Sequence, residues 1–266
     1  MGKVIVITSG KGGVGKTTAT ANIGTALAKL EKTVVVVDAD IGLRNLDVVL
    51  GLENRIVYDI VDVVEGVARL RQALIKDKKH QGLHLLPAAQ TKDKNAISPE
   101  QMKELIGQLK EKFDYVLIDC PAGIEQGFKN AIVGADEAVV VTTPEVSAVR
   151  DADRIIGLLE ASEIHDPKLI INRLRYDMVK RGDMMDTDDM LDILAIDLLG
   201  VVPDDESIVI STNRGDPVVN QVASMAGESF RNIARRINGE NVPFEEFKIE
   251  LGFMERVRGL FKINSH

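Results

Sequence analysis

The chain has 266 residues, of which 45% are hydrophobic and 28% are charged, as is ordinary for a soluble globular protein. Its net charge of −8 argues against a general nucleic-acid binder. A single cysteine, Cys120, excludes an intrachain disulfide framework and a C-x-x-C metal or iron–sulfur site. No apolar run reaches the length of a membrane span. We therefore expect one sizeable α/β core in a protein of the reducing cytoplasm.

The first predicted strand, residues 3–8, leads into a glycine-rich loop. Residues 10–18 read G-K-G-G-V-G-K-T-T and match G-x-x-x-x-G-K-[ST], the phosphate-binding loop. The β-branched strand before it and the Ala- and Leu-rich residues 18–30 after it predict the strand–loop–helix order that the motif requires. Lys16 would hold β- and γ-phosphate oxygens, and the Thr17 hydroxyl would ligate Mg²⁺. The alternative, a glycine-rich turn that binds nothing, does not explain the flanking strand and helix.

Two predicted strands end in acidic residues. Residues 33–37 precede Asp38 and Asp40, and the apolar run 115–118 precedes Asp119. Because the carboxyl ends of parallel strands lie on the ligand side of an open sheet, these carboxylates are candidates to meet Mg²⁺ or a water. The second run has the Walker B pattern, which places Asp119 near the Mg²⁺. An aspartate at a strand end is also a common helix N-cap, so the pattern alone leaves that alternative open for the first strand.

The other predicted elements alternate between helices and strands. Longer helices are predicted from Ser98 to about residue 112, from Pro144 to about residue 160 and from Asp216 to about residue 237. Short helices are predicted within 48–74, and strands at 83–87, 138–141, 168–171 and 200–203. This alternation predicts an α/β fold, a mostly parallel twisted sheet flanked by helices on both faces, as in P-loop NTPases.

Residues after the last two predicted strands are candidates to contact the nucleotide base. The first of these strands is followed by N-R-L-R, where GTPases carry N-K-x-D and pair the aspartate with guanine. Arg175 stands in the place of that aspartate, so adenine is the expected base. Asn172 and Arg173, together with Pro203 and Asp204 after the last strand, are therefore expected near the adenine.

The C-terminal residues have a different pattern from the rest of the chain. We expect an ATPase domain over residues 1–238, a linker over 239–252 and an amphipathic helix over 253–263. One face of that helix is apolar: Phe253, Met254, Val257, Leu260 and Phe261. This face is bordered on opposite sides by Arg256 and Arg258, and Lys262 lies behind Arg258. A terminal amphipathic helix usually packs on the core of its own protein. Basic flanks and a preceding linker, however, are typical of a helix at an anionic membrane surface.

These motifs resemble the ParA/MinD family of deviant Walker ATPases, in particular its septum-placing branch. K-G-G-V-G-K-T-T at 11–18 is that family's form of the phosphate loop. D-I-G-L-R-N-L-D at 40–47 is similar to its switch I, D-C-P-A-G-I-E at 119–125 to its Walker B and switch II segment, and the basic tail to its membrane-targeting sequence. The resemblance covers almost the whole chain.

The resemblance implies a Mg²⁺-dependent ATPase that dimerises with ATP and lies peripherally on the inner face of the cell membrane. The ATP-bound dimer would recruit the division inhibitor MinC and so place the septum. Hydrolysis, stimulated by a topological partner such as MinE, would release it. The alternatives are a flagellar-number regulator of the same kind and a ParA-type DNA-partitioning ATPase. Net acidity and the tail disfavour the second alternative, and no specific nucleic acid is expected as a partner.

The resemblance also assigns roles to single residues. The catalytic residues would be Lys11, which reaches the nucleotide of a second copy, Lys16, and Asp40, which orients the attacking water. The nucleotide-binding residues would be Gly10, Lys11, Gly12, Gly13, Val14, Gly15, Lys16, Thr17, Thr18, Asn172, Arg173, Pro203 and Asp204. The Mg²⁺ ligands would be Thr17, Asp38 and Asp119.

Overall fold

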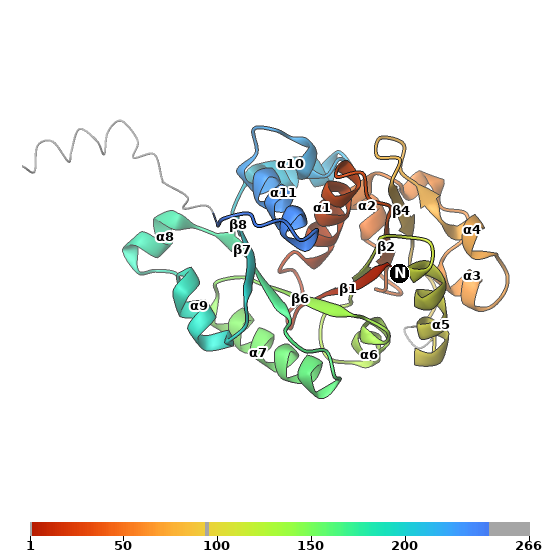
Figure 1. The fold of residues 1–266 in the computed structure, drawn as a ribbon, viewed down its shortest axis with the longest axis horizontal. Coiled ribbons are helices and arrows are strands. Elements are labelled where there is room, and N and C mark those ends of the chain that lie inside the picture. The colour runs from red at the N-terminus through yellow and green to blue at the C-terminus, as the bar shows by residue number, and fades with distance from the viewer. Residues whose placement is uncertain (1, 94–95, 245–266) are drawn as a thin grey trace, which may run out of the picture.

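A computed structural model describes residues 2–93 and 96–244 (Figure 1). Its strands form one eight-stranded sheet in the order β3-β4-β2-β5-β1-β6-β7-β8. Neighbouring strands are parallel except for the β3–β4 pair, which is antiparallel. The strands are β1 (Lys3–Thr8), β2 (Val34–Asp38), β3 (Ile75–Lys76), β4 (Leu83–Leu86), β5 (Tyr115–Asp119), β6 (Glu137–Thr142), β7 (Lys168–Leu174) and β8 (Leu198–Pro203).

Helices cover both faces of this sheet (Figure 1). They are α1 (Lys16–Lys29), α2 (Leu46–Leu50), α3 (Ile60–Val64), α4 (Leu70–Ala73), α5 (Pro99–Lys110), α6 (Gln126–Ile132), α7 (Val146–Ala161), α8 (Tyr176–Arg181), α9 (Thr187–Leu194), α10 (Glu206–Asn213) and α11 (Met225–Ile237). Two short 3₁₀ turns are η1 (Glu53–Arg55) and η2 (Val218–Asn220). Helices α1 and α11 pack together on one face, and α5, α6 and α7 lie on the other.

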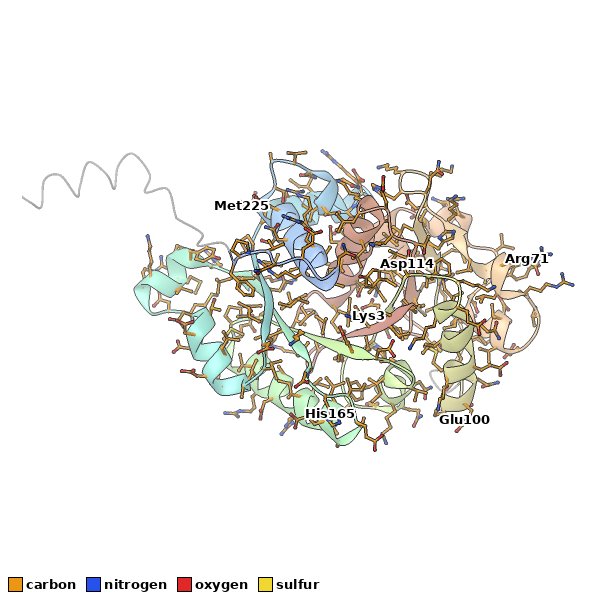
Figure 2. The ribbon with its side chains drawn as sticks, viewed as in Figure 1. Lys3, Arg71, Glu100, Asp114, His165 and Met225 are labelled. Atoms are coloured by element: carbon orange, nitrogen blue, oxygen red, sulfur yellow. The ribbon has the colours of Figure 1, made fainter. Side chains whose placement is uncertain are left out.

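The strands separate two hydrophobic cores. Along β1, Val4 and Val6 face the core under α5, α6 and α7, whereas Ile5 and Ile7 face the core under α1 and α11. Burial on both faces explains why these strands read as nearly continuous Val and Ile runs instead of alternating with polar residues. Charged residues lie on the outer sides of the helices, as Arg71 and Glu100 do in Figure 2. The predicted fold class is confirmed.

The structure contains β3 and the helices α6, α8, α9 and α10, which the sequence analysis did not predict, and it differs from the prediction most at the ends of two other elements. The last long helix begins at Met225, not near Asp216, because Pro217 has an extended ψ of 137° and only a 3₁₀ turn follows it. The true N-cap is Ser224, whose hydroxyl accepts a hydrogen bond from the Gly227 amide at 2.9 Å. The strand predicted to end at residue 171 continues to Leu174.

The described chain ends beside the start of β8. There the Arg236 guanidinium donates hydrogen bonds to the carbonyls of Leu199, Val242 and Pro243 at 2.8 to 3.0 Å, and it lies 4.2 Å from the centre of the Phe244 ring. The predicted helix at 253–263 and the linker beyond residue 244 lie outside the described residues. Within the described ranges, none of the helices has the length and apolar character that crossing a membrane requires.

Candidate functional site

The glycine-rich loop joins β1 to α1 at the carboxyl edge of the sheet. Gly13 and Gly15 have φ values of 78° and 100°, which favour glycine because a Cβ is strained there. A Cβ at Gly10 would lie 2.1 Å from the carbonyl oxygen of Asp151 on α7. A Cβ at Gly15 would lie 2.3 Å from the Nδ2 of Asn172, which donates a 2.8 Å hydrogen bond to the Val14 carbonyl. Glycine is therefore required in this loop for two reasons: the positive φ values and the lack of room for a Cβ.

The N-terminus of α1 presents the groups that the motif predicts. Lys16 is its first residue and is only 7% exposed. The Thr17 hydroxyl is hydrogen-bonded to Asp119, and the Thr20 hydroxyl lies 3.3 Å from Asp119 Oδ1. The first turn of α1 contains no acidic residue, so the partial positive charge of the helix end is available to an anion.

Asp38 and Asp119 lie side by side at the ends of β2 and β5. The two are register partners and are at most 2% exposed. Burial raises the pKa of Asp38 to about 6, and burial together with the charge of Asp38 raises the pKa of Asp119 to about 8. Asp38 also accepts hydrogen bonds from the amides of Asn45 and Leu46 at the start of α2, as a capping residue would. The N-cap residue of α2 is Asn45, so Asp38 supports the start of that helix without being its N-cap. The Asp38–Asp119 pair suits a small hard cation.

We expect Asp119→Asn to stabilise the fold in the absence of nucleotide and Mg²⁺, more at pH 8 than at pH 5. Because the pKa of Asp119 is raised to about 8, the folded protein retains a proton that the unfolded chain releases above about pH 4. The wild-type protein therefore loses stability as the pH rises between these values. The variant does not lose this contribution, because the amide of asparagine does not titrate. Thermal unfolding of both proteins at the two pH values measures this difference. An equal change in melting temperature at both pH values would contradict the raised pKa.

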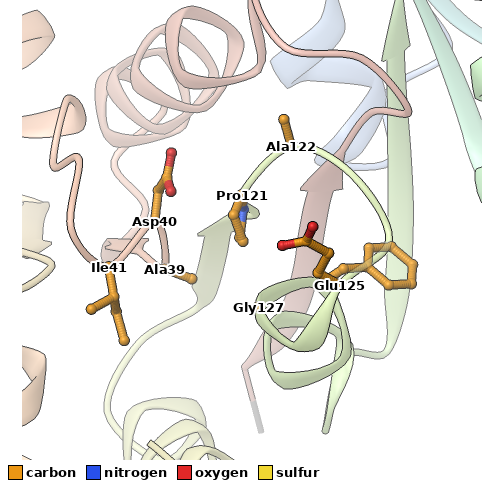
Figure 3. Close-up of a pocket in the computed structure, with 8 residues that line it drawn as sticks. Ala39, Asp40, Ile41, Pro121, Ala122, Glu125 and Gly127 are labelled. Atoms are coloured by element: carbon orange, nitrogen blue, oxygen red, sulfur yellow. The ribbon is translucent and has the colours of Figure 1, made fainter. Parts of the chain in front are cut away.

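Asp40 and Glu125 line a small cavity between the loops that follow β2 and β5 (Figure 3). Figure 3 shows the two carboxylates on opposite sides of Pro121. The cavity has a volume of about 20 Å³, which accommodates about one water molecule. Sequence reasoning did not assign a role to Glu125, although it is the last residue of D-C-P-A-G-I-E. The spacing of that motif was the available signal.

Lys11 lies across the loop from the start of α7. Its Nζ donates to Glu145 Oε2 at 3.3 Å and to Ser147 Oγ at 3.2 Å, and its side chain is 42% exposed. Gly12 and Gly13 are exposed beside it, and Thr18 is half-buried on α1. The only cysteine, Cys120, is buried next to this site, and burial raises its pKa to about 12. It is therefore an inert packing residue.

The predicted base-contacting residues come together at the ends of β7 and β8. Leu174 is the register partner of Pro203, and the Asp204 amide donates to the Leu174 carbonyl at 3.1 Å. Arg173 has a φ of 57°, so the backbone turns out of the strand pattern there. Among the described residues, no group bonds to the buried Oδ1 of Asn172. That oxygen is a ready acceptor beside the phosphate loop.

Fold and site together define a class of protein, the P-loop ATPases. The sequence matches the AAA domain family over residues 2–170. It is 58% identical to the septum site-determining protein MinD of Bacillus subtilis over the full length of both chains. The chain belongs to the septum site-determining MinD family.

Solved structures agree with this assignment. The MinC:MinD cell division protein complex of Aquifex aeolicus contains a chain that is 50% identical, with a TM-score of 0.87 over 92% of this chain and 100% of that one. The septum site-determining protein MinD of Pyrococcus horikoshii, complexed with Mg-ADP, is 32% identical, with a TM-score of 0.82 over 90% of this chain and 96% of that one. Both similarities extend over nearly all described elements.

Proposed function

We propose that this protein is an ATP-driven, dimerising membrane switch that places the division septum. The observation that carries the proposal is the phosphate loop with lysines at positions 11 and 16, set beside the buried Asp38–Asp119 pair. A relative with a similar fold binds Mg-ADP, and another forms a complex with MinC. We extend ATP, Mg²⁺ and MinC to this chain on that basis, together with a topological partner of the MinE kind.

The residues present fit a nucleotide phosphate and a magnesium ion. Lys16 and the loop amides would hold phosphate oxygens, and Thr17, Asp38 and Asp119 would hold Mg²⁺, which neutralises phosphate charge when bound. A bound cation would offset the burial and the repulsion by Asp38 that together raise the pKa of Asp119. The buried, unpaired Oδ1 of Asn172 is suited to accept from the adenine amino group. Arg173, Pro203 and Asp204 would complete the base-binding end of the site.

Asp40 is placed to orient a water. It is half-buried and lines the cavity that accommodates about one water molecule. We assign it a positioning role in hydrolysis, in which holding the water in line supplies the rate enhancement. Glu125, on the other side of the cavity, would contribute a second acceptor for the same water.

Lys11 would act only in the dimer. In the single chain its ammonium group is paired with Glu145, a half-exposed contact that contributes little free energy and breaks easily. A phosphate of a second copy would offer a stronger partner, because it carries more negative charge than one carboxylate and would lie in a contact from which water is excluded. The exchange would couple nucleotide binding to dimerisation.

Dimerisation would in turn control membrane binding through the tail. One helix with about three cations gains only about 1 kcal/mol per cation at an anionic surface, which is marginal. Two such helices held in one dimer bind with avidity, because the second binding event is intramolecular. We therefore propose residues 1–238 as the ATPase domain, 239–252 as a linker and 253–263 as a membrane-binding helix on the inner face of the cell membrane.

Co-sedimentation of the full chain with vesicles of anionic phospholipid tests the proposal. We expect sedimentation with ATP and little with ADP or without nucleotide. A parallel experiment replaces the vesicles with double-stranded DNA. ATP-dependent DNA binding without lipid binding would favour a partitioning ATPase and overturn the membrane switch.

Phe261→Glu is expected to abolish ATP-dependent vesicle binding and to leave unstimulated ATPase activity and melting temperature near the wild-type values. The carboxylate would lie in the middle of the proposed lipid-facing side, where an unpaired charge is costly. Arg258→Glu should weaken binding less and in a salt-dependent way, because it removes attraction to headgroups without removing apolar burial. If Phe261→Glu lowers the melting temperature and lipid binding persists, the tail packs on the core and the switch must be withdrawn.

A further inference from the structure

A groove of about 660 Å³ lies between the start of α7 and the α8–α9 connection. Its apolar lining consists of Pro144, Val146, Met178, Val179, Met184 and Met185. Val146 is 67% exposed, and the methionines at 178, 184 and 185 are half-buried. Methionine side chains adapt to the shape of an apolar ligand, and a lining of this kind suits the apolar side of a helix.

The rim of this groove is acidic. Glu145, Asp183, Asp186 and Asp189 line it, and residues 183–192 read D-M-M-D-T-D-D-M-L-D without a basic residue. Asp183 is the rim residue already paired with a neighbouring arginine, Arg181, at 2.8 Å. An apolar floor with an acidic rim complements a segment that carries aliphatic and aromatic residues on one side and cations beside them.

We propose that this groove holds the chain's own C-terminal segment, residues 253–263, when the protein is a single copy. That segment has the complementary composition: five apolar residues recur at helical spacing, with Arg256, Arg258 and Lys262 beside them and one acidic residue, Glu255. The same apolar side would enter either the groove or a lipid surface, so the two sites compete for it. The regulatory consequence of this competition rests on the proposed membrane switch, whereas the docking itself does not.

The length of the chain permits this docking. The described residues end at Phe244, which lies on Arg236 beside Leu199 at the start of β8. Helix α9 precedes β8 closely, and its eight residues span about 12 Å at 1.5 Å per residue. The connection from Leu194 to Leu198 spans at most about 13 Å, so the first residue of α9, at the groove, lies within about 25 Å of the start of β8. Residues 245–252 reach about 26 Å when extended.

Glu145 connects the groove to the nucleotide site. It lines the groove and is also the residue to which Lys11 donates at 3.3 Å. In the proposed dimer Lys11 leaves Glu145 for the nucleotide of the second copy, and that copy then lies against the start of α7. The groove and the dimer contact therefore share Glu145, so dimerisation displaces the tail at the moment when two tails become available to the membrane.

Disulfide formation in the full-length, nucleotide-free protein tests the docking. Val146→Cys and Val257→Cys in one chain are expected to form an intrachain disulfide at least about tenfold faster than the pair Ile193→Cys and Val257→Cys. Ile193 is a matched control, because it is 53% exposed and lies on α9 outside the groove, nearer in sequence to β8. The native Cys120 does not compete, because it is buried and its pKa is raised to about 12. Equal rates for the two pairs, or a disulfide between two chains, would overturn the proposal.

A charge reversal tests the regulatory consequence. Asp183→Lys with Asp189→Lys is expected to slow disulfide formation between the cysteines introduced at positions 146 and 257 to the rate of the control pair. It is also expected to increase vesicle binding without nucleotide. Asp188→Lys with Asp192→Lys makes the same change of charge on exposed positions outside the groove and should do neither. Equal effects of the two double variants would overturn the proposal. If the disulfide between positions 146 and 257 forms fast in a protein that never binds vesicles, the docking proposal stands and the membrane function is refuted.

Discussion

Lys16→Ala is expected to abolish nucleotide binding while leaving the fold intact. Lys16 is the buried cation of the loop, at the first position of α1, and it is the group that the motif directs to the β- and γ-phosphates. Loss of a charge-assisted hydrogen bond of this kind costs about 1.5–3 kcal/mol, and Lys16 would make such bonds to both the β- and the γ-phosphate. Titration calorimetry with Mg-ATP measures the affinity, and thermal unfolding verifies the fold.

Lys11→Ala is the matched control for that experiment. It removes the same charge from the same loop but from a side chain that is 42% exposed and paired with Glu145. We expect this variant to retain Mg-ATP binding as a single chain. Normal affinity in the Lys16 variant would refute the assignment of that residue, whereas equal loss in both variants would indicate a general effect of loop charge.

The second large effect separates dimerisation from hydrolysis. Lys11→Ala should neither dimerise with ATP nor hydrolyse it, because the proposed contact forms only between two copies. Asp40→Ala should bind ATP and dimerise but hydrolyse it at least about a hundredfold more slowly, as expected when a positioned water loses its acceptor. Light scattering with ATP reports the dimer, and phosphate release reports hydrolysis.

Two outcomes would contradict these assignments. A stable ATP-bound dimer with unchanged hydrolysis in Lys11→Ala would mean that this lysine is only a solvated side chain paired with Glu145. Full hydrolysis in Asp40→Ala would exclude its positioning role and direct attention to Glu125, the other carboxylate of the cavity. An Asp40→Ala, Glu125→Gln double variant distinguishes shared positioning from none.

The sequence by itself determined what depends on neighbours along the chain. The phosphate loop could be predicted because strand, glycines and helix are contiguous, and the helix start at Ser98 was predicted for the same reason. Buried parallel strands were recognisable as Val and Ile runs, because both of their faces are covered. The start of the last helix was misplaced, because the Asp216–Pro217 pair resembles a helix start, whereas the backbone there turns into η2.

Only the tertiary structure decided which distant residues meet. Asp38 and Asp119 adjoin because β2 and β5 are neighbours in the sheet, and their raised pKa values follow from burial that strand patterns do not specify. Asn172 holds the Val14 carbonyl although 158 positions separate them in the sequence. Lys11 meets Glu145 across the loop in the same way, and the acidic groove exists only because α7 and the α8–α9 connection lie together. Local patterns specify elements and motifs, whereas sheet order and packing specify which side chains share a site.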